Sequence, residues 1–168
     1  MLLVGDYDDA FETWLFDGTS YSHITRTNAD HSGGGAAQYL HSNGERGVVL
    51  TAGQFNYEGM TEWYSPTSNT WTRMNRTEGH AWLYGFTMAT VNNTVFLFGG
   101  KELWAAHRQD VYQMRITFDY DILPERMQSI SRHQFTTIQQ QNRILHFGGD
   151  RDQFAECWTL NEFNRKWE

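Results

Sequence analysis

Histidine is the residue type in this chain with the clearest capacity for chemistry, because it can bind a metal ion or carry a proton near neutral pH. Three of the seven histidines, His31, His80 and His133, recur at intervals of 49 and 53 residues. Such spacing puts each one at the same position of a repeated unit, so the three should lie apart instead of converging on one metal. We interpret them as strand-opening residues that bond to a neighbouring loop. The other four show no ligand spacing: His23, His41, His107 and His146.

Two acidic loops could bind a hard cation through carboxylate oxygens. Residues 5–9 are Gly-Asp-Tyr-Asp-Asp, and residues 149–152 are Gly-Asp-Arg-Asp. Neither has the Asp-x-Asp-x-Asp-Gly spacing of a calcium loop, which favours solvated turns. The glycine-rich run at 31–35 lacks the Gly-Lys-Ser/Thr of a phosphate-binding loop and indicates a flexible connection. The sequence therefore predicts no metal site and no cofactor.

Nucleophilic chemistry has little support in the sequence. The single cysteine, Cys157, rules out an internal disulfide. It falls in a predicted strand beside Trp158, where a buried and unreactive thiol is favoured. No serine lies in the glycine-flanked turn that exposes a catalytic nucleophile. We predict no catalytic residue and a chain that is not an enzyme.

A repeat of about 48 residues organises the chain. Its marker is an apolar run that ends in a glycine doublet, as in Val95–Gly100 and Ile144–Gly149. A weaker copy ends at Ala52-Gly53, and the first copy keeps only Gly5. Glycine accepts backbone angles that a Cβ forbids and allows close approach of neighbouring chain segments. We therefore interpret these glycines as structural: Gly5, Gly53, Gly99, Gly100, Gly148 and Gly149.

Each doublet is followed by a polar loop, an aromatic strand and a turn, and the alternation predicts half-buried strands. Two of these turns are closed by tryptophan, Trp71 and Trp167. With these features the chain resembles kelch-repeat β-propellers, whose blades carry a hydrophobic run before Gly-Gly and then a spaced Tyr and Trp. The resemblance covers essentially the whole chain and implies that the Tyr and Trp rings pack between blades.

The repeat predicts an all-β fold of four antiparallel strands per blade, in an incomplete or unusually small ring. We expect blades at about 1–28, 29–77, 78–130 and 131–168, with three, four, four and three strands. Closed propellers normally have about four to eight blades, and closure removes exposed strand edges. The chain could be a piece of a larger propeller, could assemble with a copy of itself, or could close as an irregular four-bladed ring. A partner chain or segment that completes the propeller is the favoured explanation.

Composition narrows the classes of partner. A net charge of −7 and the lack of a Lys/Arg block argue against nucleic acid, and no apolar run is long enough to span a bilayer. The lone cysteine and the absence of a signal-peptide core favour the cytoplasm. Two N-glycosylation patterns, at Asn75 and Asn92, fall at predicted turns and leave an extracellular location open.

Propellers usually bind partners through loops on one face of a rigid scaffold. We therefore expect a non-enzymatic protein-interaction module or scaffold subunit. The kelch resemblance implies ubiquitin-ligase adaptors, actin-associated scaffolds and extracellular adhesion modules as family roles. The alternative function is a galactose-oxidase-like copper enzyme fragment, or an extracellular adhesion or glycan-binding propeller. The predicted contact residues follow the glycine doublets: Tyr7, Asp8, Phe55, Asn56, Tyr57, Leu103, Trp104, His107, Arg151 and Asp152.

Overall fold

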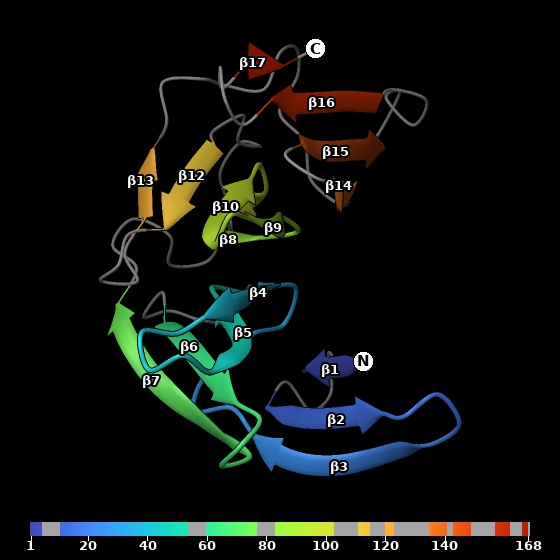
Figure 1. The fold of residues 1–168 in the computed structure, drawn as a ribbon, viewed down its shortest axis with the longest axis vertical. Coiled ribbons are helices and arrows are strands. Elements are labelled where there is room, and N and C mark those ends of the chain that lie inside the picture. The colour runs from blue at the N-terminus through green and yellow to red at the C-terminus, as the bar shows by residue number, and fades with distance from the viewer. Residues whose placement is uncertain are drawn as a thin grey trace.

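The computed structural model describes ten segments of the chain (Figure 1). Every regular element within these segments is a β-strand, which confirms the predicted all-β class. Among the described residues there is also no helix that could cross a membrane. The segments are 1–4, 11–53, 60–76, 83–102, 111–114, 120–122, 135–140, 143–148, 157–161 and 166–167.

Sheet 1 has three antiparallel strands in the order β1-β2-β3. They are β1 (Leu2–Val4), β2 (Glu12–Phe16) and β3 (Tyr21–Arg26). The predicted number of strands in the first repeat was also three. Because β1 pairs with β2 alone among the strands that the structure describes, it lies at the edge of this three-stranded sheet.

Sheets 2, 3 and 4 each have four strands that follow one another as an antiparallel meander. Sheet 2 contains β4 (Gly35–Leu40), β5 (Arg46–Thr51), β6 (Met60–Ser65) and β7 (Thr70–Arg76). Sheet 3 contains β9 (Thr87–Val91), β10 (Thr94–Phe98), β12 (Val111–Met114) and β13 (Tyr120–Ile122). Sheet 4 contains β14 (Phe135–Gln140), β15 (Arg143–Gly148), β16 (Cys157–Asn161) and β17 (Lys166–Trp167).

One prediction about the strands is wrong. The last repeat was predicted to have three strands, but β17 pairs with β16 through Leu160 and Trp167 and makes a fourth. A two-residue strand is too short to show an alternating pattern in the sequence. Residues 83–91 form two strands with different partners: β8 (Leu83–Tyr84) pairs with β11 (Lys101–Glu102), whereas β9 pairs with β10. Gly85 lies between them with a φ of 63°, which turns the chain out of the first pairing.

The hydrophobic core lies between the sheets, because alternate residues of one strand pack against different neighbours. In sheet 2, Val49 and Trp63 pack with residues of sheet 3, such as Leu97. Leu50 and Tyr64, next to them in the sequence, pack instead toward sheet 1. All residues of β6 are therefore buried. The cluster toward sheet 1 comprises Leu50, Tyr64 and Trp71, with Leu2, Val4, Ile24 and Val48 packed against it.

The first strands of sheets 2, 3 and 4 lie next to one another, since β4 contacts β9 and β9 contacts β14. The doublet glycines at the ends of the preceding runs have left-handed backbone angles, with φ of 63° at Gly99 and 99° at Gly100. A Cβ at Gly100 would come within 2.9 Å of the Phe86 Cβ. Ala52, which replaces glycine in its copy, takes the same region at a φ of 53°. These angles explain why this corner of the repeat favours glycine.

Candidate interaction surface

The contact residues predicted from the loops behind the glycine doublets lie outside the described residues, as do Gly5, Gly149, His80 and His133. The described backbone includes Gly148 at the end of β15, Cys157 in the predicted strand β16 and Trp167 in β17. The predicted contact residues that lie outside the described part of the chain are Tyr7, Asp8, Phe55, Asn56, Tyr57, Leu103, Trp104, His107, Arg151 and Asp152.

The two glycosylation patterns lie in different environments. Asn75 is inside strand β7, not at a turn as predicted, because the strand continues to Arg76. Asn92 is exposed and lies at the turn between β9 and β10 with a φ of 47°. Asparagine tolerates this left-handed angle, which two-residue hairpin turns require.

A buried acid, Glu62, joins sheet 2 to the segment that follows sheet 1. The side chains of Glu62 and His31 are fully buried, and His31 Nε2 lies 3.3 Å from Glu62 Oε1. On its other side the imidazole Nδ1 donates to the Ala52 carbonyl oxygen at 2.7 Å. This bond agrees with the prediction that the histidine bonds to a neighbouring loop. The carboxylate also accepts the backbone N–H of Asn28 at 2.9 Å and its side-chain N–H at 2.9 Å.

The same segment is held at two further points. The Arg73 guanidinium donates to the Asn28 carbonyl oxygen at 2.9 Å. Nearby, the Trp71 indole N–H donates to the buried Thr13 hydroxyl at 2.9 Å, which ties β7 to β2. Because the side chains of Glu62 and His31 are fully buried and their polar atoms are bonded within the protein, we interpret the cluster as a structural clamp between sheets 1 and 2.

The clamp makes stability depend on pH in the acid range. Burial raises the pKa of Glu62, but hydrogen bonds from His31 and Asn28 outweigh it, and the pKa lies below the ordinary value of 4.5. A carboxyl with a lowered folded-state pKa stabilises the fold above its unfolded-state pKa, and this contribution disappears as the pH falls through the folded-state value.

We expect the difference in unfolding free energy between the natural chain and Glu62→Gln to be constant above about pH 5 and to shrink below it. Urea unfolding followed by tryptophan fluorescence at several pH values measures this difference. A difference that grows as the pH falls would contradict the assignment.

The outer face of sheet 1, the face turned away from sheet 2, carries large apolar side chains. Leu3 pairs with Trp14 across β1 and β2, and Trp14 pairs with His23 of β3, so the three share this face. Phe16 and Tyr21 are paired beside them, with ring centroids 4.6 Å apart. Exposed fractions are 39% for Leu3, 41% for Trp14 and 56% for Tyr21. This uncovered face consists of Leu3, Trp14, Phe16, Tyr21 and His23.

The corresponding face of sheet 2 shows what covers such a surface. It also presents a leucine and two aromatic rings, Leu50, Tyr64 and Trp71, and sheet 1 packs against it. Tyr64 and Trp71 are there only 7% exposed. The two faces are thus similar in chemistry, but among the described residues only the face of sheet 2 is covered by another sheet. Within the described part of the chain, the outer face of sheet 1 is the largest group of exposed apolar side chains.

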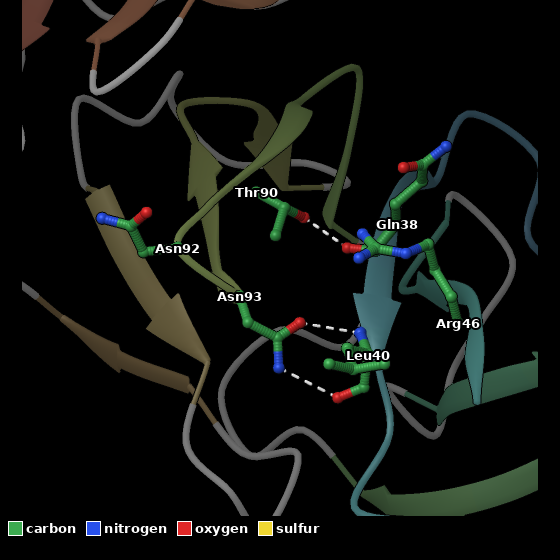
Figure 2. A pocket seen from close by; sticks show the side chains of 6 residues that line it. All are labelled: Gln38, Leu40, Arg46, Thr90, Asn92 and Asn93. Carbon is green, nitrogen blue, oxygen red and sulfur yellow. Dashed lines mark hydrogen bonds between the residues drawn. The ribbon is translucent and has the colours of Figure 1, made fainter. Parts of the chain in front are cut away.

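A polar cavity of about 260 Å³ lies where sheet 3 meets strand β4 (Figure 2). Asn93 accepts the Leu40 N–H at 2.7 Å and donates to the Leu40 carbonyl oxygen at 2.9 Å, and the Thr90 hydroxyl donates to the Gln38 carbonyl oxygen. The Asn93 and Thr90 side chains thus bond to backbone groups on the edge of β4 that does not pair with β5. These bonds protect that edge from pairing with another strand. Figure 2 shows that the Asn92 side chain points away from β4.

A second, more apolar cavity of about 490 Å³ lies between sheets 1 and 2. Gln38 and Arg46 line both cavities. The Arg46 guanidinium has no hydrogen bond or ion pair to any residue that the structure describes, although it is exposed between the two cavities. The apolar part of the second cavity is formed by Leu2, Leu15, Ile24, Val48 and Tyr64.

Glu62, Leu3 and Trp14 were not among the predicted site residues. A charged residue inside the aromatic run Thr61–Tyr64 is a signal for a bonded buried acid, because an unpaired charge would be costly there. Nothing in the local sequence distinguishes Trp14 from Trp63, since both lie in strands with an alternating pattern.

No protein-family model matches this chain, and comparison with curated proteins finds no match.

Proposed function

We propose that this chain is a non-enzymatic protein-interaction module, a scaffold subunit built from kelch-like propeller blades. The uncovered aromatic face of sheet 1 is the observation that carries the proposal. An apolar sheet face of this kind is a typical site for a protein partner. The successive meander sheets, with their first strands adjacent, support the blade arrangement.

The partner that this face fits is another β-sheet, supplied by the chain or segment that completes the ring. Sheet 2 provides the precedent, because its own leucine and aromatic rings are covered by a sheet of the same chain. The face has charged residues beside its rings: Glu12 forms an ion pair with Arg26 at an N–O distance of 3.0 Å and also contacts His23. An apolar centre with a polar margin is the usual composition of a protein interface.

The test is the native mass and composition of the complex purified with the tagged chain. We expect a particle larger than the 19.6 kDa chain that contains a second β-rich polypeptide. The double substitution Leu3→Ser and Trp14→Ser should remove that polypeptide, since it replaces the apolar centre of the face. Analytical ultracentrifugation and mass spectrometry of the recovered chains measure both results.

Leu40→Ser is the matched control, because Leu40 is 37% exposed, much like Leu3, but lies in sheet 2. It should leave the complex intact. A monodisperse 19.6 kDa particle that is unaffected by either set of substitutions would overturn the proposal.

A further inference from the structure

Among the strands that the structure describes, none pairs with the inner edge of sheet 1, whereas the corresponding strands of the other three sheets are paired on both sides. In sheets 2, 3 and 4 the strand that carries the glycine run, β5, β10 or β15, is paired on both sides. The corresponding strand of sheet 1 is β1, which has β2 on one side only. In Figure 1, β1 is the strand of its sheet nearest to β4, and β3 is the farthest.

The hydrogen-bonding groups of β1 fit an added strand. Met1 exchanges both of its backbone bonds with Phe16, at 2.8 Å each. Bonded and non-bonded pairs alternate in an antiparallel ladder. Leu2 and Val4 therefore direct their N–H and C=O groups toward the open edge. An antiparallel strand can form a ladder with these two residues.

The cavity beside this edge is lined on one side by Gln38 of β4. Ala37 and Tyr39 pack toward sheet 3, so the alternate residues of β4 face the opposite way, toward sheet 1. Among these alternate residues, Gln38 is exposed and lines the second cavity. The cavity that Leu2 and Leu15 share with Gln38 and Arg46 lies at the Leu2 end of β1.

From this geometry we infer that the open edge of β1 binds an extended peptide segment of another polypeptide, with an apolar side chain in the second cavity and a carboxylate on Arg46. Direction determines where the carboxylate lies. A strand antiparallel to β1 runs from the Val4 end to the Leu2 end and finishes beside Arg46. The carboxylate therefore belongs at the C-terminal end of the bound segment, as a chain terminus or an acidic side chain.

Charge supports a carboxylate at this position. The guanidinium of Arg46 is unpaired among the described residues, and a carboxylate is the partner that its donor geometry matches. Addition of a strand to a free sheet edge derives affinity from main-chain bonds and specificity from pockets for alternate side chains. This site is separate from the outer aromatic face, so it can be tested independently of the proposed function.

Strand β4 supplies a probe whose register is known. Its residues Ala37 and Tyr39 pair with Val49 and Gly47 of β5, while the backbone of Gln38 and Leu40 bonds to sheet 3. A labelled hexapeptide with the sequence of residues 35–40 and a free C-terminus should therefore bind β1 with its tyrosine opposite Leu2. Fluorescence anisotropy with the whole 168-residue chain measures the affinity.

Two paired comparisons identify the binding mode. N-methylation at the positions of Ala37 or Tyr39 should weaken binding at least about tenfold, because these N–H groups face β1, whereas methylation at the positions of Ala36 or Gln38 should be tolerated. Replacing the terminal carboxylate by an amide should weaken binding roughly two- to fivefold. Arg46→Gln should abolish that difference, whereas Arg26→Gln, on the opposite face of sheet 1, should preserve it.

Three results would overturn the inference. The first is no binding up to the solubility limit of the peptide. The second is that methylation weakens binding equally at both pairs of positions, or that replacing the carboxylate by an amide still weakens binding to the Arg46→Gln variant. The third is that the chain sediments as a dimer and that this dimer does not bind the peptide. That result would assign the open edge of β1 to a second copy of the chain. None of these results bears on the partner of the outer face, which is tested by Leu3→Ser and Trp14→Ser.

Discussion

Glu62→Ala is expected to lower the free energy of unfolding by about 3–5 kcal/mol at neutral pH. The substitution removes a fully buried carboxylate and leaves His31 Nε2 and two N–H groups of Asn28 without their acceptor. His31 is fully buried, and a buried donor that loses its partner incurs the full cost of desolvation. Urea unfolding monitored by tryptophan fluorescence gives the free energy directly.

Glu12→Ala is the matched control for this prediction. Glu12 also contacts a histidine, His23, but that imidazole is exposed on the outer face of sheet 1. Exposed pairs contribute at most about 1 kcal/mol, so this variant should remain close to the natural chain. His31→Ala combined with Glu62→Ala should cost less than the sum of the two single changes. Equal losses for Glu62→Ala and Glu12→Ala would contradict the clamp.

Trp71→Ala is expected to destabilise the fold by a similar amount, about 3–5 kcal/mol. The indole packs with Leu50 and Tyr64 between sheets 1 and 2, and its ring centroid lies 5.2 Å from that of Tyr64. Its removal leaves a cavity that two rigid sheets cannot readily close. It also deprives the buried Thr13 hydroxyl of the indole N–H.

Two further variants accompany this prediction: Trp71→Phe separates packing from hydrogen bonding at Trp71, and Trp14→Ala is the control on the uncovered face. Trp71→Phe keeps an aromatic ring but loses the bond to Thr13, and should cost about 1–3 kcal/mol. Trp14→Ala should change the free energy by no more than about 0.5 kcal/mol, because Trp14 lies on the uncovered face. Chemical denaturation of the three variants under identical conditions measures these values. A loss for Trp14→Ala as large as that for Trp71→Ala would show that its face is covered within the chain itself.

Much of the sheet structure could be predicted because its signals are local. The alternation along Arg46–Thr51 and Met60–Ser65 and the turn residues between strands are properties of short segments. The glycine runs mark the same strand in each sheet because left-handed angles at Gly99 and Gly100 depend on the adjacent backbone. Short elements such as β8, β11 and β17 were missed, since two residues cannot display a period.

The sequence alone determined the all-β class, the repeat and the three-stranded first sheet, because strand alternation and turn chemistry are encoded within a few residues. Only the tertiary structure decided which faces are covered. Tyr64 is buried and Tyr21 exposed, although each lies on a strand of alternating pattern. Likewise Glu62 is clamped by Asn28, 34 residues earlier in the chain. Burial depends on what packs against a face, and those neighbours come from distant segments that no local pattern specifies.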